Sequence, residues 1–161
     1  LMLTGQLGDT MKESAQAAMS YIRSQAVKFS IDEEILKKLD IHIHIPAGAI
    51  PKDGPSAGVA LFSALLSILT GRPLPYDIAM TGEISLRGSV LPVGGIKEKL
   101  VGAKNAGIRT VLIPKKNEKD LSDIPDSVSE RMKIELIDTL DEVVERFFPD
   151  GKKQGKRKIE R

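Results

Sequence analysis

The sequence predicts a mixed α/β fold, built as a single compact domain, and three observations support this prediction. Helix-like and strand-like segments follow one another along the 161 residues, which is typical of sheets covered by helices. The stretch 54–71 has no charged side chain, although 29% of all residues are Asp, Glu, Lys or Arg, which favours a buried helix. The stretch 40–45 alternates isoleucine with polar residues, as a half-buried strand does.

An amphipathic helix is predicted from about residue 10 to residue 29. Thr10 and Glu13 have the spacing of a capping box, and apolar side chains then recur on one helical face. A short helical piece at 32–38 precedes the strand 40–45, which has three isoleucines on one face and His42 and His44 on the other.

The two histidines could bind a metal together, but no HExxH motif or Cys/His cluster supplies further ligands. No metal site is therefore predicted. Because the strand ends eleven residues before Ser56, His44 is interpreted as a supporting residue near a site around that serine.

The uncharged helix should begin near Pro55 and Ser56 and end at Gly71, with Pro73 close behind. At 100° per residue its hydroxyl side chains share one narrow stripe, so the helix should be buried on nearly all sides. Ser56 would lie at its first turn, where unpaired N–H groups and the helix dipole favour a developing anion. Ser56 is then either a nucleophile or only a helix cap.

The segments 77–82, 84–88 and 90–93 are predicted as short strands separated by glycines, and a helix follows from 96 to 106. On that helix Ile96, Leu100 and Ala103 point inwards, and Lys99 lies at the edge of this apolar stripe. Desolvation lowers the pKa of a lysine amine, and only a neutral amine accepts a proton. Lys99 is thus a candidate general base, or a side chain whose stem only covers apolar surface.

The last third of the chain continues the same alternation. A strand at 109–113, a loop with short helical pieces at 121–131 and a strand at 133–137 are predicted in this order. Thr139 and Glu142 have capping-box spacing at the start of a last helix over 140–148.

Composition restricts the possible chemistry. The absence of cysteine excludes disulfides, thiolate zinc sites and a cysteine nucleophile, so covalent catalysis would need Ser, Thr, Lys or a carboxylate. No secretory signal or membrane span is visible, so a cytoplasmic location without a membrane partner is expected. The first residue, Leu1, suggests a fragment of a longer chain.

The net charge of +2 depends on the C-terminal residues 150–161. This segment holds six of the 24 basic residues and two of the 22 acidic ones, so the remainder has more acidic than basic residues. The segment has no aromatic residue for base stacking. It is predicted to be a disordered basic tail, and nucleic acid is not an expected partner.

Three stretches, 51–58, 80–88 and 90–99, together resemble the proteolytic domain of bacterial-type Lon, the ATP-dependent protease. They occur in the family's order, with Ser56 and Lys99 43 positions apart as the family has them, and the likeness runs from about Leu3 to Phe148. It implies that residues 1–149 are a Lon-type proteolytic domain that lacks the family's first strands.

The resemblance implies a serine endopeptidase with a dyad of Ser56 as nucleophile and Lys99 as general base. It also implies that Thr81 orients the lysine, and that Asp53 is an acidic residue of a loop linked to activity. The substrates would be unfolded or damaged proteins fed by an AAA+ ATPase module, in a hexameric ring of identical chains. ATP and Mg²⁺ would belong to that module, because no GxxxxGK[ST] motif occurs here and no cofactor is expected in this chain.

Two other classes of protein remain possible. In a phosphate- or nucleic-acid-binding domain of related fold, the segment 54–58 would hold a phosphate at the helix start. A non-catalytic assembly domain would keep the core pattern and need neither Ser56 nor Lys99. The position of Lys99 at an apolar edge distinguishes the peptidase from the phosphate-binding domain.

Overall fold

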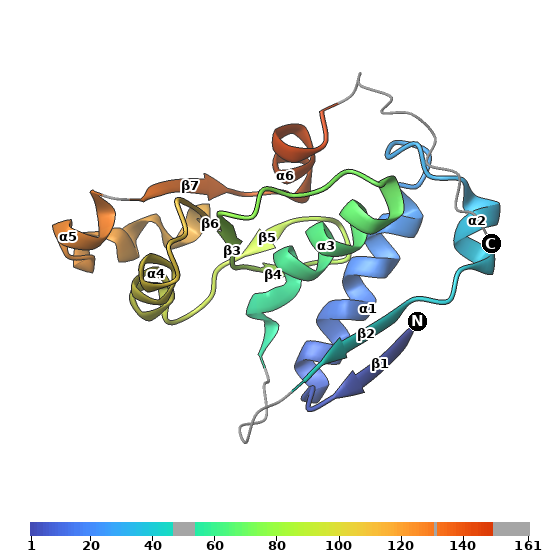
Figure 1. Ribbon diagram of the computed structural model, residues 1–161, viewed down its shortest axis with the longest axis horizontal. Helices are drawn as coiled ribbons and strands as arrows, with labels where there is room; N and C mark the ends of the chain where they lie inside the picture. Colours follow the sequence, from blue (N-terminus) through green and yellow to red (C-terminus); the bar gives the residue numbers. More distant parts are fainter. Residues whose placement is uncertain (47–53, 131, 150–161) are drawn as a thin grey trace.

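The computed structural model describes residues 1–46, 54–130 and 132–149, whose strands form three small sheets with helices packed against them (Figure 1). The predicted α/β class is confirmed. The central sheet is parallel, with β6 (Thr110–Pro114) between β3 (Ile78–Met80) and β7 (Lys133–Ile137). In the described ranges, no helix has both the length and the apolarity needed to cross a bilayer.

Strand β6 divides the apolar interior into two clusters, because successive side chains of a strand point to opposite faces. Leu112 packs into a cluster with α1 (Asp9–Ser24) and α3 (Gly58–Thr70), which lie side by side in Figure 1. Val111 and Ile113 pack into the other cluster, beneath α4 (Ile96–Asn105). The central strand therefore joins the helix that follows Ser56 to the helix that carries Lys99.

A separate parallel pair is formed by β1 (Met2–Gly5) and β2 (His42–Ile45). The alternation predicted for β2 is confirmed, since its isoleucines are half-buried and its histidines are exposed. Strand β1 was not predicted, because its residues Met2–Gly5 do not alternate between apolar and polar side chains. Between them in sequence, α2 (Glu33–Lys38) follows its N-cap Asp32, whose carboxylate accepts a hydrogen bond from the Glu34 backbone N–H.

Helix α1 differs from its prediction at both ends. It begins at Asp9 with Gly8 as N-cap, so the predicted capping box at Thr10 is wrong, and the Thr10 carbonyl instead accepts a bond from the Ser14 hydroxyl. It ends at Ser24 rather than near residue 29. The reason is that Ala26 and Phe29 stay buried in the turns after the helix, so the apolar pattern continues beyond it.

Helix α3 ends as predicted, with Gly71 in the left-handed region at φ +68°. The prediction that it is buried on nearly all sides is wrong, because the Ile68 side chain is 77% exposed. The polar stripe is not its outer face, since Ser63 is fully buried and donates to the Val59 carbonyl at 2.8 Å. A serine or threonine hydroxyl that donates to a carbonyl of its own helix can be buried at little cost in free energy. A row of such residues along a helix therefore does not show which face is exposed to solvent.

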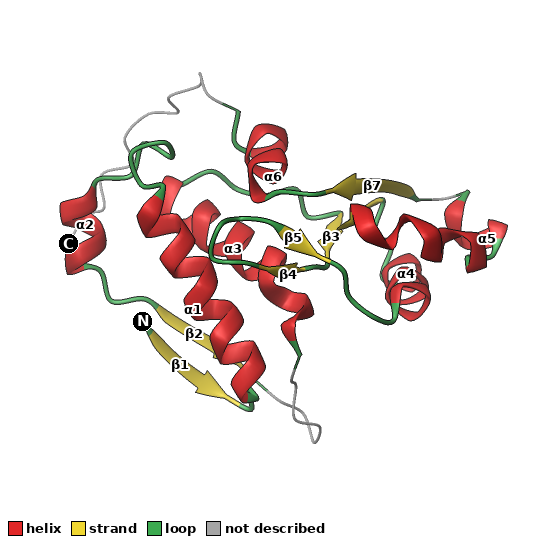
Figure 2. Ribbon diagram, turned by 180° about the vertical axis from the view of Figure 1, so that it is seen from behind, coloured by secondary structure: helices red, strands yellow, loops and turns green. Residues whose placement is uncertain are grey.

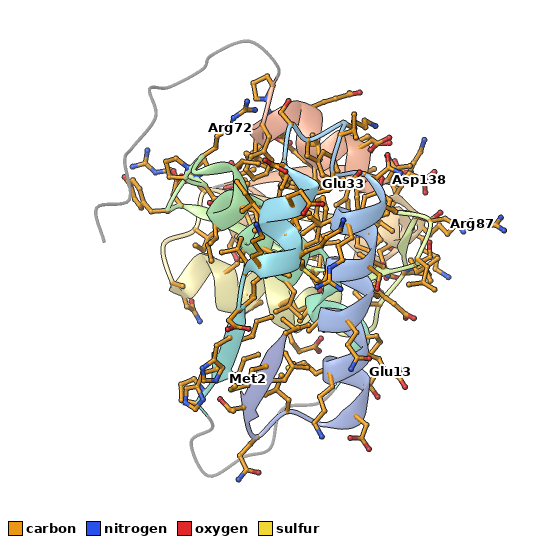
Figure 3. The ribbon with its side chains drawn as sticks, turned by 90° about the vertical axis from the view of Figure 1, so that its right-hand side faces the viewer. Met2, Glu13, Glu33, Arg72, Arg87 and Asp138 are labelled. Carbon is orange, nitrogen blue, oxygen red and sulfur yellow. The ribbon has the colours of Figure 1, made fainter. Side chains whose placement is uncertain are left out.

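A short antiparallel hairpin, β4 (Glu83–Ile84) and β5 (Val90–Leu91), follows β3 in sequence and lies beside α1 and α3 (Figure 2). The strand predicted at 84–88 is wrong beyond Ile84. There the Ser85 hydroxyl accepts hydrogen bonds from the backbone N–H groups of Arg87 and Ser89 and closes a turn. Figure 3 shows Arg87, in this turn, pointing away from the molecule.

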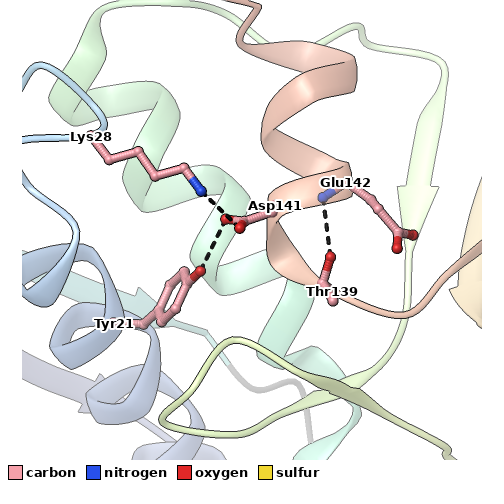
Figure 4. Close-up of polar contacts among 5 residues, drawn as sticks. All are labelled: Tyr21, Lys28, Thr139, Asp141 and Glu142. Atoms are coloured by element: carbon pink, nitrogen blue, oxygen red, sulfur yellow. Dashed lines mark hydrogen bonds and ion pairs between the residues drawn. The ribbon is translucent and has the colours of Figure 1, made fainter.

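After β6 the chain forms a 3₁₀ helix, η2 (Lys115–Asp123), which was not predicted, and the short helix α5 (Asp126–Ser129). The last helix, α6 (Leu140–Phe147), confirms its prediction. The Thr139 hydroxyl caps it by accepting from the Glu142 N–H at 3.4 Å (Figure 4). The Glu142 carboxylate in turn accepts from the Asp138 N–H, which completes a reciprocal cap.

The start of α6 is joined to α1 by a buried tyrosine (Figure 4). The Tyr21 hydroxyl donates to Asp141 at 3.1 Å, and Lys28 forms an ion pair with the same carboxylate at 2.7 Å. A Cβ at Gly88 would lie 2.5 Å from the Tyr21 ring, so the hairpin also rests on this ring. Burial, and then the charge and hydrogen bond of Asp141, raise the pKa of Tyr21 to about 12.

We expect Tyr21→Phe to remove part of the alkaline instability of the protein. The unfolded chain loses the tyrosine proton near pH 10.0, whereas the folded chain keeps it up to about pH 12. The raised pKa therefore contributes its full stability below pH 10.0, and this contribution is lost as the pH rises towards about 12. The free energy of unfolding of the original protein should therefore fall over that range more steeply than that of Tyr21→Phe. At neutral pH the variant should lose about 0.5–1.5 kcal/mol, the net value of a hydrogen bond. Urea titrations at a series of pH values measure both effects.

Tyr76 provides a matched control, because its side chain is 92% exposed. Tyr76→Phe should keep the pH dependence of the original protein. Equal alkaline slopes for Tyr21→Phe and Tyr76→Phe would contradict the role of the buried hydroxyl.

Candidate active site

Ser56 lies in the 3₁₀ helix η1 (Pro55–Ala57), which leads directly into α3. Gly54 precedes it with φ +128°, a conformation that favours glycine. Pro55 then fixes the backbone angle at the start of the helix. Ser56 is half-buried and lies just before α3, whose core-facing residues are anchored in the larger apolar cluster.

The structure excludes the interpretation of Ser56 as a helix cap. The N-cap position of η1 is Gly54 and that of α3 is Ala57, and neither helix has a side-chain cap hydrogen bond. Among the described residues the Ser56 hydroxyl has no hydrogen-bond partner. A cap would have to accept from a backbone N–H, so this hydroxyl serves no capping function here.

The Ser56 backbone is held by the segment that follows β3. Its carbonyl accepts from the Gly82 N–H at 2.9 Å and from the Thr81 hydroxyl at 3.3 Å, and the Val59 N–H donates back to the Gly82 carbonyl at 3.1 Å. A Cβ at Gly82 would lie 2.8 Å from Val90 and 2.9 Å from Val59, so only glycine fits there. The start of α3 is thus bonded to the segment leading into the hairpin.

Thr81 is buried and lies at this junction. Its hydroxyl contacts the Ser56 carbonyl, while its backbone N–H continues the sheet by donating to Leu112. No hydrogen bond from Thr81 to Lys99 occurs among the described residues. Its expected role in orienting the lysine stays a prediction, and the structure instead shows it beside the serine.

Lys99 lies in the first turn of α4 and is half-buried, as the edge position predicted. Its backbone N–H donates to the Gly95 carbonyl at 3.0 Å, and its ammonium donates to the Gly94 carbonyl at 2.6 Å. Gly95 has φ +70° and forms the N-cap of α4. Both ends of the lysine are therefore held by the loop between β5 and α4.

Ser56 and Lys99 are connected through the hairpin but not by a hydrogen bond. The segment at Gly82 holds the serine, and the chain then runs through β4 and β5 into the loop that holds the lysine (Figure 2). Catalytic hydrogen bonds are often formed only when substrate is present, so this geometry does not test the dyad. The pairing of Ser56 with Lys99 stays a prediction.

Of the other two predicted supporting residues, Asp53 and His44, the structure describes only His44. Asp53 lies outside the described residues. His44 is exposed on β2, and its Nδ1 lies 2.8 Å from the Thr4 hydroxyl, while Nε2 of His42 lies 2.7 Å from the same oxygen. A hydroxyl has one proton, so at least one of the two rings donates its own N–H to Thr4. No contact of His44 with Ser56 or Lys99 occurs in the described part of the chain.

The prediction from sequence missed Asn117, which contacts the loop that holds Lys99. Asn117 is 3% exposed and hydrogen-bonds both the N–H and the carbonyl of Val93. It lies among charged residues and 24 positions from its partner, so neither periodicity nor spacing could have identified it.

Two hollows lie near these elements. An open groove of about 660 Å³ follows the start of α4 and is lined by residues 94–98 together with Asp120 and Asp123. A cavity of about 280 Å³ lies between the end of α1, α3 and α6, and it is lined by neither Ser56 nor Lys99. The groove therefore gives solvent access to the loop beside Lys99.

Comparison with known proteins gives the family. The model of the Lon protease (S16) C-terminal proteolytic domain matches residues 1–150. The chain belongs to this family.

Individual Lon relatives support the same assignment. Lon protease 2 of Thermus thermophilus is 58% identical over 153 residues, which cover 95% of this chain and 19% of that protein. The Lon protease of Brevibacillus choshinensis is 60% identical over 144 residues, or 89% of this chain and 18% of that protein. The Lon-family chain described here thus spans about a fifth of the length of these relatives, and the resemblance noted from its motifs is confirmed.

Proposed function

We propose that this chain is the proteolytic domain of an ATP-dependent Lon protease and cleaves peptide bonds with Ser56 as nucleophile and Lys99 as general base. The observation that carries the proposal is the state of Ser56. Its carbonyl is fixed by Gly82 and Thr81, while its hydroxyl neither caps a helix nor bonds to another described residue. A fixed backbone with an uncommitted hydroxyl suits a nucleophile.

In the proposed reaction the neutral Lys99 amine accepts the Ser56 hydroxyl proton while the hydroxyl oxygen attacks the peptide carbonyl carbon. The resulting ammonium gives this proton to the leaving amine as the C–N bond breaks, which forms an ester on Ser56. A water molecule then gives a proton to the neutral Lys99 and attacks the ester carbonyl. Collapse of that intermediate returns the proton to Ser56 and releases the carboxyl product.

This reaction requires Lys99 to change its hydrogen-bond partner. In the structure the Lys99 ammonium donates to the Gly94 carbonyl at 2.6 Å. Release from Gly94 would let the amine lose its proton and reach the Ser56 hydroxyl. In the proposal this change is made by rotation about the lysine side-chain torsions.

The developing oxyanion would be held by backbone N–H groups at the start of α3. The N–H groups of Gly58 and Val59 are already bonded, to the carbonyls of Pro55 and Gly82 respectively. The N–H of Ser56 donates to no described residue and lies at the positive end of the helix dipole, whereas that of Ala57 belongs to the turn of η1. We propose that the Ser56 N–H is one donor of the oxyanion site.

The same hydrogen bonds argue against the phosphate-binding alternative. A phosphate cradle at 54–58 needs several converging N–H donors, because each phosphate oxygen accepts more than one bond. Pro55 has no N–H, and those of Gly58 and Val59 are occupied. Too few N–H groups remain for a phosphate, whereas the Ser56 N–H suits a single oxyanion.

For the whole protein, we propose that the substrates are unfolded polypeptides delivered by an ATPase module, in a ring of identical chains. This extends the printed names of the relatives, which are Lon proteases about five times as long as this chain. We propose that this chain itself needs neither nucleotide nor metal for hydrolysis.

Labelling with a fluorophosphonate, followed by mass mapping, tests the nucleophile. We expect one covalent adduct, on the peptide that contains Ser56, and we expect a peptide boronate to prevent it by occupying the same site. Ser63 is an internal control, because its buried hydroxyl donates within α3 and should not react. An adduct on another residue, or no adduct together with no peptide hydrolysis, would overturn the proposal.

A further inference from the structure

The side chain of Asn117 pairs with a backbone unit in the way that a neighbouring strand would. Its Oδ1 accepts from the Val93 N–H at 3.0 Å, and its Nδ2 donates to the Val93 carbonyl at 2.8 Å. Nδ2 also donates to Asp120 at 2.6 Å. The Val93 N–H can only donate, so this network fixes which amide atom is oxygen and which is nitrogen. Asn117 is buried although η2 is otherwise rich in charged residues.

The residue that Asn117 holds is directly before the two glycines that hold Lys99. Val93 is followed by Gly94, whose carbonyl accepts the Lys99 ammonium, and by Gly95, whose carbonyl accepts the Lys99 backbone N–H. Glycines alone would leave this loop with many conformations. The two hydrogen bonds from Asn117 restrict the backbone conformation of this loop, which the glycines do not. Only one peptide unit separates Val93, which Asn117 holds, from Gly94, which holds the Lys99 ammonium.

We propose that Asn117 is a positioning residue for Lys99, which fixes the loop 93–95 and through it the place of the amine. This proposal rests on the proposed Ser56 and Lys99 dyad. A general base must come within about 2.6–3.2 Å of the proton that it accepts. A displacement of about 1 Å can cost roughly 10²-fold in rate. Asn117 controls this distance without contact with substrate.

The test compares Asn117→Ala with Val143→Ala. Val143 is buried in α6 within the other apolar cluster, so its truncation should destabilise the chain without changing the loop 93–95. Fluorophosphonate labelling of Ser56 is measured below the unfolding temperature of both variants. We expect Asn117→Ala to slow labelling by roughly 10–100-fold, and Val143→Ala to leave it within about twofold.

A second measurement reports Lys99 without using the dyad. In a Ser56→Ala background, the rate of acetylation of Lys99 by acetic anhydride is compared with that of exposed Lys97 on the same helix. Asn117→Ala should raise the ratio of Lys99 to Lys97 severalfold, because the amine is released from Gly94. Val143→Ala should leave the ratio unchanged.

Asn117→Asp tests whether the donor to Val93 is the essential feature. The ionised carboxyl cannot donate, and it would face both the Val93 carbonyl and Asp120. Burial and the Asp120 charge should raise its pKa, and its protonated form regains one donor. The labelling rate relative to the original protein should therefore rise as pH falls from about 8 to about 6.

The outcomes separate this proposal from the dyad. Labelling of Ser56 at equal rates in Asn117→Ala and Val143→Ala would overturn the role of Asn117 and leave the dyad standing. Slower labelling with an unchanged ratio of Lys99 to Lys97 would also overturn it, since the effect would not pass through the lysine. Failure of the original protein to label at Ser56 would refute the dyad, and the positioning proposal with it. This would hold even if the acetylation ratio still showed that Asn117 fixes the loop 93–95.

Discussion

Ser56→Ala is expected to abolish peptide hydrolysis and leave the fold unchanged. Loss of the nucleophile of a serine protease lowers kcat by on the order of 10⁴- to 10⁶-fold. The stability cost should stay below about 0.5 kcal/mol, because the hydroxyl caps neither η1 nor α3 and lies on a half-buried residue. Hydrolysis of a fluorogenic peptide and urea unfolding measure the two quantities on the same sample.

Ser63→Ala is the matched control, because it removes a hydroxyl from α3, the helix that follows Ser56. Ser63 donates to the Val59 carbonyl and is fully buried, so its loss should affect stability more than activity. The two variants should therefore show opposite patterns. Hydrolysis at the original rate by folded Ser56→Ala would exclude Ser56 as the nucleophile.

The parts of the fold that sequence predicts best are those in which a local pattern and the final packing agree. In β2 the alternating side chains match the half-buried face, and at α6 the cap residues bond within three or four positions of each other. At α1 the pattern failed, because Phe29 is buried from a turn and extends the apolar period past the helix end. The turn after Ile84 failed for another reason, since the Ser85 hydroxyl closes it by two local bonds.

The candidate site shows the same division. The half-buried position of Lys99 follows from helical spacing alone, because Ile96 and Leu100 fix which face of α4 points inwards. The bonds that hold Ser56 to Gly82, and Val93 to Asn117, join positions 26 and 24 residues apart. Such contacts depend on how the central sheet places distant segments, and no local pattern records them. Motif spacing located the two candidate residues, and the structure alone shows what holds each of them.

Lys99→Arg is expected to lower peptide hydrolysis by about 10²- to 10⁴-fold, the usual contribution of a general base. The guanidinium keeps the length, the positive charge and a donor for the Gly94 carbonyl, so the loop 93–95 and the fold should be preserved. It cannot lose its proton at any pH at which the protein is folded, so it cannot accept one from Ser56. The substitution thus separates the charge of Lys99 from its basicity, and peptide hydrolysis over a range of pH measures the result.

Lys97→Arg is the control for this change, because Lys97 is exposed on the same helix turn and has no role in the proposed reaction. It should hydrolyse the peptide at the original rate, and both variants should unfold at the same urea concentration as the original protein. Raising the pH should not restore activity to Lys99→Arg, because the guanidinium stays charged throughout. An active Lys99→Arg variant would show that the side chain acts as a fixed cation, and the base would then have to be found among the other groups near Ser56.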